Sequence, residues 1–313
     1  MSNQISTAFI ETFRSNIIML SQQKGSRFQG KVRMETQAAK TDYYERVGSV
    51  DAQEITTRHG DTPILNTPHT RRALTLVDAE YGDMIDEMDR VRLLIRPDDA
   101  YVKAAVWALG RKKDDQVIAA ALGNAYGGVS GSTATALPST QKVACHDGST
   151  TTGVNLNVRT LRKVAEKFDS NDIDPDIPKY FAYTSSQKQS LLAETEVTSS
   201  DYNTIRALVA GEIDTFMGFK FIRTERLVRS STDITYNVST GVVGSGTGTI
   251  TAANSRRCFA WVEDGLVMAI GKETAAKIAE RADKRFGTQV YVRQSVGATR
   301  LEEVKVVEVD CSE

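Results

Sequence analysis

The sequence AYVKAAVWALGRKKDDQVIAAAL at residues 100–122 predicts one long helix. Its apolar residues recur at helical spacing and are expected to face inward: Val102, Val106, Leu109, Val117, Ala121 and Leu122. Arg111 should form exposed ion pairs with Asp114 and Asp115, which lie one turn further along. Gly123 ends the pattern. At about 1.5 Å per residue the helix is over ~30 Å long, more than a compact domain of this size usually requires.

The segment before this helix indicates an extended arm. Strand patterns occur at 31–37, 43–47 and 72–77. Between the last two lies 50–71, which has almost no periodic apolar pattern and contains the breakers Gly60, Pro63 and Pro68. This connection is too long for an ordinary hairpin, and two half-polar strands cannot bury much surface by themselves. We therefore expect an arm that requires a partner.

The N-terminal segment predicts an amphipathic helix over residues 4–20. One face carries Ile5, Phe9, Phe13, Ile17 and Leu20. The polar residues 22–26 that follow separate this helix from the rest of the chain. It can dock on its own chain or on a neighbouring molecule, and the sequence leaves both open.

Downstream of Gly123, a Gly, Ser and Thr-rich connector at 127–153 leads into alternating helices and strands. We expect helices at 157–168, 185–193, 202–210 and 272–285. We expect strands at 180–184 and 216–223, a surface hairpin or small insertion at 229–257, a strand pair at 259–270, and a closing hairpin at 289–310. No repeat with a period of 20 to 50 residues is present.

Composition excludes several classes of protein. The chain has 39 basic and 40 acidic residues, so it lacks the positive charge of a protein that wraps nucleic acid. No apolar run approaches the roughly 20 residues needed to span a bilayer, and residues 1–20 lack the features of a signal peptide. The widely spaced Cys145, Cys258 and Cys311 indicate free thiols rather than a disulfide framework or zinc site. These features predict a protein made in a cytoplasm.

The motifs that could carry chemistry are each incomplete. The glycine-rich 244–248 is followed by Thr249 and Ile250 rather than by a helix whose N-terminus could hold a phosphate. The segment 265–273 fails the P-loop spacing, and 128–132 lacks the second glycine of a nucleophile elbow. The histidines lie in loops without ligand spacing: His59, His69 and His146. We therefore expect no catalytic, cofactor-binding or metal-binding residues, and no enzyme.

Two segments of opposite charge flank the third strand pattern. The acidic segment contains Asp83, Asp86, Glu87 and Asp89. The basic segment contains Arg58, His59, Arg71 and Arg72. Planar guanidinium groups can bind carboxylates at two points, so we hypothesise that these segments pair between subunits. With Phe9 and Phe13, they are the expected inter-subunit contacts.

The order of these features resembles the Hong Kong 97-type major capsid proteins of tailed bacteriophages. The block Val47-Gly48-Ser49-Val50-Asp51, continuing through Arg58-His59-Gly60-Asp61 to Pro68-His69-Thr70-Arg71-Arg72, is similar to the extended-arm segment of one branch of that family. The block from Tyr101 to Ala125 is similar to its spine helix, and Gly218-Phe219-Lys220-Phe221-Ile222 to a strand of its axial domain. The resemblance covers nearly the whole chain and implies an α+β capsid fold.

The resemblance also implies a division of the chain. It places an N-terminal arm at 1–28, an extended loop at 29–82, a peripheral domain at 83–150 with the spine helix at 100–122, an axial domain at 151–274 with a hairpin insertion near 229–257, and a return to the peripheral domain at 275–313. The arms at 1–28 and 50–70 should become ordered on assembly, because polar segments without a core need a partner to offset their ordering entropy.

By this resemblance the chain is a coat protein that assembles into the hexamers and pentamers of an icosahedral head around double-stranded DNA. It implies a separate scaffolding protein, a portal, a possible decoration protein, at most non-specific contact with the packaged DNA, and no membrane partner. Its place is the virion, after synthesis in the host cytoplasm. Three alternatives stay open: an encapsulin-like bacterial compartment, an enzyme with a loop-borne site, and a tail-tube protein. Genome neighbours or particle contents would distinguish the first of these.

Overall fold

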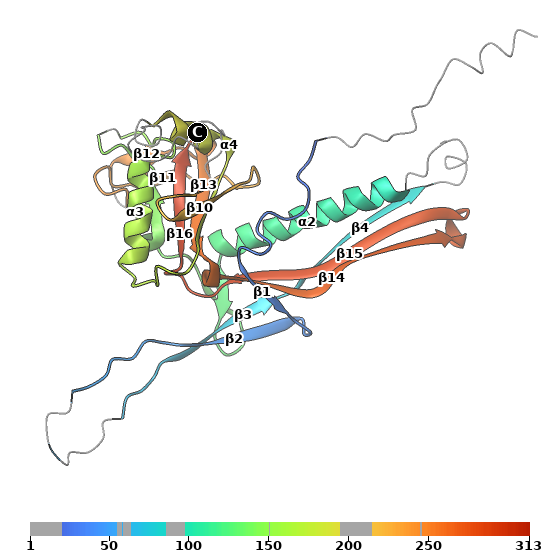
Figure 1. Ribbon diagram of the computed structural model, residues 1–313, viewed down its shortest axis with the longest axis horizontal. Coiled ribbons are helices and arrows are strands. Elements are labelled where there is room, and N and C mark those ends of the chain that lie inside the picture. The colour runs from blue at the N-terminus through green and yellow to red at the C-terminus, as the bar shows by residue number, and fades with distance from the viewer. Residues whose placement is uncertain are drawn as a thin grey trace, which may run out of the picture.

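The computed structural model describes residues 21–54, 58, 64–85, 98–149, 151–194, 215–244 and 246–313. The molecule is elongated (Figure 1). A compact region of helices and strands lies at one end, a long layer of helix on sheet extends from it, and a thin two-stranded arm leaves in another direction. This mixed architecture confirms the α+β class predicted from the sequence. In the described part of the chain, no helix is both long and apolar enough to cross a membrane.

The long layer consists of helix α2 (Asp98–Leu122) on a four-stranded sheet in the order β1-β14-β15-β4. The strands are β1 (Arg33–Thr36), β14 (Leu266–Arg281), β15 (Gly287–Arg300) and β4 (Val77–Ile85). Ala105 and Leu109 of the helix are buried against Val290 and Val292 of β15. The predicted helix is confirmed, but Val106 is 38% exposed and does not face inward as expected.

The compact region is built on a six-stranded sheet in the order β7-β16-β13-β8-β10-β9. Its strands are β7 (Lys142–Ala144), β16 (Val306–Ser312), β13 (Ser255–Val262), β8 (Lys179–Tyr183), β10 (Phe219–Arg223) and β9 (Thr215–Phe216). Helices α3 (Val158–Asp169) and α4 (Ser185–Ala193) accompany it, as expected. The sheet collects strands from three of the predicted segments, 83–150, 151–274 and 275–313, so those boundaries stay predictions.

Local sequence explains where both helices begin. Asn157 caps α3 by accepting a hydrogen bond from the backbone N–H of Thr160 at 2.8 Å. Thr184 and Gln187 form a capping box at the start of α4. Apolar residues of α3 alternate at helical spacing and are buried in the largest core: Val158, Leu161, Val164 and Phe168.

Two smaller sheets complete the described structure. The arm and its root form a four-stranded sheet, β2-β3-β5-β6, from β2 (Thr41–Val47), β3 (His69–Thr75), β5 (Ala125–Gly127) and β6 (Thr133–Thr135). The hairpin expected within 229–257 is present as β11 (Ile234–Tyr236) paired with β12 (Gly248–Ile250). It packs on Ala144 at the end of β7.

The structure contradicts the helix expected at 272–285. That segment lies largely in β14, which pairs with β15 from Leu266↔Arg300 to Arg281↔Gly287, with register shifts near Lys272. The sequence has good helix formers, but pairing with a valine-rich partner overrides a propensity of a few tenths of a kcal/mol per residue. The helices expected at 4–20 and 202–210 lie outside the described residues.

The closing hairpin expected at 289–310 is also wrong. Strand β15 pairs with β14 and β4, whereas β16 pairs with β13 and β7 in the other sheet. The turn between them therefore carries the chain from the long layer into the compact region. Strand patterns alone could not distinguish this from a hairpin, since both need the same period of two.

The described end of the N-terminal arm is anchored on α2 through Asp114. This side chain is fully buried. It accepts hydrogen bonds from Gln23 Nε2 at 2.5 Å, Ser26 Oγ at 2.5 Å and the backbone N–H of Arg27 at 3.0 Å. A buried carboxylate with several donors holds its partner segment firmly, because each donor left unpaired would cost about 1–3 kcal/mol.

The ion pairs expected between Arg111 and the two carboxylates are therefore absent from the described contacts. Arg111 donates to Gln22 Oε1 at 2.9 Å and to the carbonyl of Gln23 at 3.1 Å. Asp115 instead accepts two hydrogen bonds from Arg226, at 2.6 and 2.5 Å. The helix thus uses its charged stretch to hold other segments of the chain.

Phe28 completes the anchor by entering the largest core. Its ring stacks on Phe259 with a centroid separation of 5.9 Å and lies 5.4 Å from the ring of Trp261. Trp261 in turn donates its indole N–H to the carbonyl of Lys31 at 2.9 Å. Residues 22–28 are therefore fixed to their own chain, and any reach toward a neighbour must come from residues before them.

Candidate functional site

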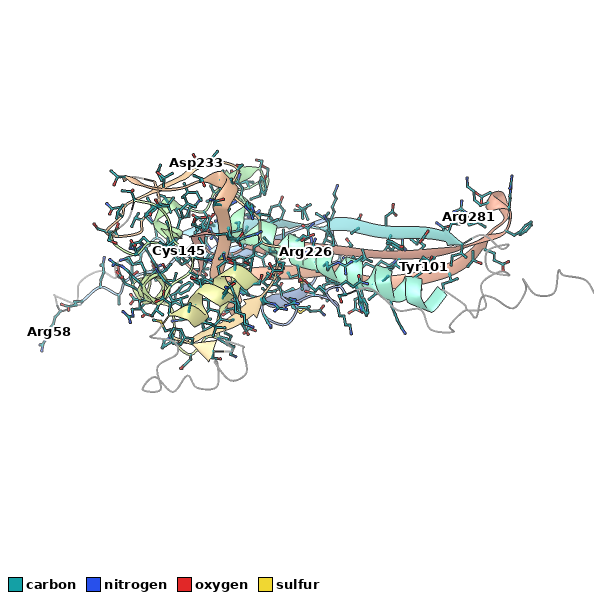
Figure 2. All side chains as sticks on the ribbon, turned by 90° about the horizontal axis from the view of Figure 1, so that it is seen from above. Arg58, Tyr101, Cys145, Arg226, Asp233 and Arg281 are labelled. Atoms are coloured by element: carbon teal, nitrogen blue, oxygen red, sulfur yellow. The ribbon has the colours of Figure 1, made fainter. Side chains whose placement is uncertain are left out.

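The arm begins as a regular antiparallel ladder. Strands β2 and β3 pair from Thr41↔Thr75 to Val47↔His69, and Gly48 then donates its N–H to the carbonyl of Pro68 at 2.9 Å. Beyond this bond the chain runs away from the rest of the molecule (Figure 1). Figure 2 shows Arg58 near the end of this arm and Arg281 at the opposite end of the molecule.

Apolar side chains along the arm are exposed to solvent. Ile64 is 91% exposed and Val47 66%, and Val50 and Leu65 are exposed as well. Single exposed apolar residues are common on proteins, but several on one thin arm need a partner surface to be covered. The arm therefore has the chemistry of a segment that binds to another molecule.

The root of the arm holds three arginines around one carboxylate. Arg72 donates to Glu303 Oε1, Arg46 Nη1 lies 3.7 Å from Glu303 Oε2, and Arg300 Nε lies 4.0 Å from Glu303 Oε1. Arg46 also donates to the carbonyl of Leu301. Burial, and the charges of Arg46 and Arg300, lower the pKa of Arg72 to about 10. Three guanidinium groups surround a single carboxylate, so the cluster carries a net positive charge.

Arg300 connects this cluster to the spine helix. Its side chain is fully buried. Nη1 donates to the carbonyls of Ala121 at 2.9 Å and Gly123 at 3.0 Å, and Nη2 to that of Thr135 at 3.2 Å. Helix C-termini leave their last carbonyls unpaired and carry partial negative charge, so a cation fits there. Burial lowers the pKa of Arg300 to about 10, which leaves it protonated at neutral pH.

A cavity of about 550 Å³ opens beside the cluster. Its lining includes Arg46, Arg71, Arg72 and Glu303, together with the exposed Val129. Tyr126 of β5 and Tyr43 of β2 are also exposed on this sheet. Arginine and tyrosine are enriched at protein interfaces, because each offers apolar area together with hydrogen-bonding groups. The root of the arm thus has the composition of a protein-binding surface.

Arg71 and Arg72, the neighbouring arginines expected to contact another subunit, face opposite sides of strand β3. Arg71 is partly exposed, with 39% of its side chain accessible; its Nη2 lies 2.9 Å from Glu45 Oε1, and its guanidinium is 5.5 Å from the ring of Tyr43. Arg72 points the opposite way and is buried on Glu303. Side chains alternate along a strand, so adjacent residues face opposite sides. Arg72 serves the fold of its own chain, and Arg71 keeps an accessible charge.

The other expected contacts are only partly described. Asp83 on β4 is half-buried and accepts a hydrogen bond from Tyr81 Oη at 3.2 Å. From Arg71 to Asp83 the chain is almost continuous strand, which at about 3.3 Å per residue spans roughly 40 Å. One subunit therefore does not bring them together. The remaining expected contacts lie outside the described residues: Phe9, Phe13, His59, Asp86, Glu87 and Asp89.

Arg46, Arg300 and Glu303 were missed by the sequence analysis. They are far apart along the chain, and no spacing motif links them. One signal was available at Arg300. The even-numbered positions Val290, Val292 and Val296 face inward, and Arg300 continues the same alternation. A basic residue at a buried strand position indicates an internal partner.

A second charged cluster lies in the compact region. Glu308 and Asp310 are both buried on one face of β16. Arg257 donates to Glu308, and Lys142 Nζ lies 3.3 Å from Glu308 Oε2. A separate cavity of about 330 Å³ opens beside these residues, and Asp233 lines it together with Lys142, Arg257, Glu308 and Asp310. Burial, and the neighbouring charge of Glu308, raise the pKa of Asp310 to about 8, although Arg257 and Lys142 oppose this.

Asp310→Asn should remove a pH dependence of stability. The unfolded chain loses this proton near pH 4, while the folded chain keeps it until about pH 8. Rising pH across that window therefore favours the unfolded state, and the free energy of unfolding falls. The variant should be more stable than the parent at pH 7.5, with a difference that shrinks toward pH 4. Urea unfolding at several pH values measures this, with the exposed Asp176→Asn as control. Lower stability of the variant at pH 7.5 would contradict it.

The sequence model of a family described as phage capsid protein matches residues 5–313. The chain belongs to this family. No curated protein matches it. The fold is similar to that of solved phage capsids, which confirms the expected Hong Kong 97-type fold. The capsid of cyanophage P-SCSP1u matches with a TM-score of 0.73 and 14% identity, over 99% of this chain and 96% of that one.

Two further capsids show the same likeness. The capsid of cyanophage Pam1 matches this phage capsid protein with a TM-score of 0.70 and 14% identity, over 98% of this chain and 97% of that one. The acid-stable capsid of Helicobacter pylori bacteriophage KHP30 matches with a TM-score of 0.68 and 12% identity, over 99% and 98%. The chain is thus a phage capsid protein, as the resemblance implied, and the family match supports this rather than the encapsulin alternative.

Proposed function

We propose that this phage capsid protein is the major coat subunit of a tailed phage, forming the hexamers and pentamers of an icosahedral head around double-stranded DNA. The observation that carries the proposal is the arm with exposed Val47, Val50, Ile64 and Leu65, which its own chain leaves uncovered. In a closed shell, each arm would lie on a neighbouring subunit. When each subunit contacts the next one head to tail, the subunits form a closed ring if the rotations from copy to copy add up to a full turn.

Electron microscopy of the purified chain tests this proposal. We expect closed hollow particles, formed either by the chain alone or with an added scaffolding protein. A uniform small oligomer that never closes under either condition would contradict it. Particles that package enzymes rather than DNA would instead support a compartment shell.

In this proposal the residues that hold neighbours are those of the N-terminal arm before residue 22 and those of the extended loop within 29–82. Residues 83–150 and 275–313 form a peripheral domain, and 151–274 lie nearer the capsomer centre. The partners are other copies of the chain, a separate scaffolding protein, a portal and, in a phage that carries one, a decoration protein. DNA is contacted non-specifically at most, since the net charge of the chain is −1. The subunit is made in the host cytoplasm, resides in the virion and has no enzymatic role.

The accessible Arg71 and Arg58 would bind the acidic segment of a second copy. This segment comprises Asp83, Asp86, Glu87 and Asp89. Opposite charges separated along one elongated chain are free to meet between copies, and such complementarity fixes register and partner choice. Arg72 contacts Glu303 of its own chain, so charge reversal at Arg72 would disturb folding as well as assembly.

Arg71→Glu should raise the concentration needed for assembly by about tenfold, corresponding to about 1.4 kcal/mol per contact. Light scattering against subunit concentration measures this. The variant also places two acids opposite each other at the Glu45↔Arg71 pair. The double substitution Glu45→Arg with Arg71→Glu restores that internal pair with its charges exchanged. It therefore separates the loss of an inter-subunit contact from the repulsion between two acids within the arm. If the double variant assembles like the parent, Arg71 acts within its own arm and the inter-subunit contact is wrong.

A further inference from the structure

The three cysteines, which are far apart in the sequence, meet inside the compact region. Cys311 lies in β16, Cys258 in the adjacent β13, and Cys145 directly after β7 on the other side of β16. Figure 2 shows Cys145 within this region. All three are fully buried. The Sγ atoms of Cys145 and Cys311 are 3.2 Å apart, which is close contact for two sulfurs that are not bonded.

The backbone around this pair has the geometry of a disulfide site. Strands β16 and β7 are parallel with Asp310 beside Ala144, so Cys311 and Cys145 are the next pair in register. The N–H of Cys145 donates to the carbonyl of Asp310 at 2.8 Å, which holds the two backbones at strand spacing. Neighbouring strands lie about 4.8 Å apart, within the roughly 4.4–6.8 Å between Cα atoms that disulfides require.

Cys258 is placed less favourably. It pairs with Val309 across the antiparallel β13–β16 ladder, whereas Cys311 is opposite Arg256. Cys258 and Cys311 are therefore diagonal neighbours, whose separation exceeds that of directly paired residues. Cys258 still comes close enough to influence Cys311, whose thiol pKa is raised by burial and by contacts with Cys145 and Cys258.

We propose that Cys145 and Cys311 are an oxidisable pair that forms an intrachain disulfide when the protein meets a small-molecule disulfide. The Cys145 thiolate attacks the small disulfide and releases one thiolate, giving a mixed disulfide. The Cys311 thiolate then attacks the Cys145 sulfur, forms the Cys145–Cys311 bond and releases the second thiolate. The two protons lost by the cysteines end on the two released thiols, and the small disulfide takes up both electrons.

Access for this reaction comes from the edge of the sheet. Strand β7 is three residues long and is the outer strand next to β16. Its far side is held by the Val143↔Val242 bridge and by the N–H of Ala144, which donates to the carbonyl of Gly241 at 2.8 Å. Opening of this short segment together with these contacts would expose Cys145 without unfolding the sheet. The raised pKa of the Cys311 thiol keeps the thiolate that closes the bond scarce. Oxidation should therefore be slow at neutral pH and faster as the pH rises.

The bond would close a loop across a sequence separation of 166 residues, which includes most of the compact region. Long closed loops lose the most unfolded-state entropy, so the oxidised chain should be clearly more stable. For a shell made in a reducing cell and then released, this stabilisation would appear after release. That biological setting rests on the proposed function, but the chemistry depends on the pair alone.

The test uses the full chain with Cys258→Ser, so that within one chain only Cys145 and Cys311 can form a disulfide. The protein is incubated with oxidised glutathione at pH 8.5, just below its unfolding temperature, until the thiol count is constant. We expect no thiol titratable in denaturant, a linked peptide pair joining Cys145 to Cys311, and a rise in Tm of about 5–10 °C that dithiothreitol reverses. Cys145→Ser and Cys311→Ser in the same background should show no rise.

Two outcomes would overturn the proposal. The first is that, once the thiol count is constant, the protein still has two free thiols or carries glutathione adducts without a linked peptide. The other appears in the parent with all three cysteines, as a Cys258–Cys311 or Cys145–Cys258 link in place of the expected one. Because subunits that never form shells can be tested in the same way, failure of this proposal is distinguishable from failure of the proposed function.

Discussion

Replacing residues 49–67 by Asn-Gly should abolish shell formation and leave the rest of the fold intact. The β2–β3 ladder ends at Val47↔His69, and Asn-Gly can join such strands in a tight hairpin turn. The described residues that this removes are nearly all exposed, so their own chain loses little buried area. In a shell, each subunit would lose a contact on a neighbour, and the loss repeats at every subunit.

Two measurements separate the effects of this replacement. Electron microscopy and sedimentation should show subunits or small oligomers where the parent forms closed particles. The Tm of the unassembled subunit should change by less than about 2 °C, because surface changes are usually within about 0.5 kcal/mol.

Ile64→Asp with Leu65→Asp should reproduce the assembly defect with two substitutions, and Ile64→Val with Leu65→Val should assemble. Normal particles from the shortened chain would show that the arm does not hold the shell together.

The sequence was sufficient for the parts of this fold that depend on local pattern. The helix predicted at 100–122 is α2 at 98–122, because its apolar spacing and its flanking Pro97 and Gly123 agree. The arm was predicted from the length of 50–71 and its breakers, together with its half-polar strands. The helix needed only the period of its apolar residues, and the arm needed the lack of such a period together with the breakers.

The errors arose where distant segments decide the structure. Residues 272–285 have helical propensity, yet pairing with β15 makes most of them strand. Asp114 and Asp115 look alike in sequence, but Asp114 is buried under residues 23–28 and Asp115 is bound by Arg226. Periodicity reports which residues share a face, and it does not report what covers that face.

The candidate site shows the same limit. Arg71 was identified with its neighbour Arg72 as a basic pair, and strand alternation then separates them into one partly exposed and one buried side chain. The partner of Arg72 is Glu303, which is 231 residues away in sequence. A single sequence carries no signal for such a pairing, because the two residues are brought together only by long-range contacts between strands.

Arg300→Met should cost about 3–5 kcal/mol in the free energy of unfolding, the range for removing one partner of a buried ionic network. Methionine fills similar volume but donates no hydrogen bond, so the carbonyls of Ala121, Gly123 and Thr135 lose their donor. The end of α2 and the β5–β6 region would both loosen. Urea unfolding of the subunit measures the loss.

The matched control is Arg293→Met, which is an exposed arginine of the same strand β15. Its cost should stay within about 0.5 kcal/mol, since surface substitutions rarely exceed that. Arg300→Lys should recover little, because one ammonium group cannot replace a planar fork that reaches three carbonyls. Since the cluster joins the spine helix to the root of the arm, hydrogen exchange in Arg300→Met should rise first near residues 120–135. If Arg293→Met and Arg300→Met lower the free energy of unfolding by the same amount, the hydrogen bonds of Arg300 do not stabilise the fold and its side chain is replaceable.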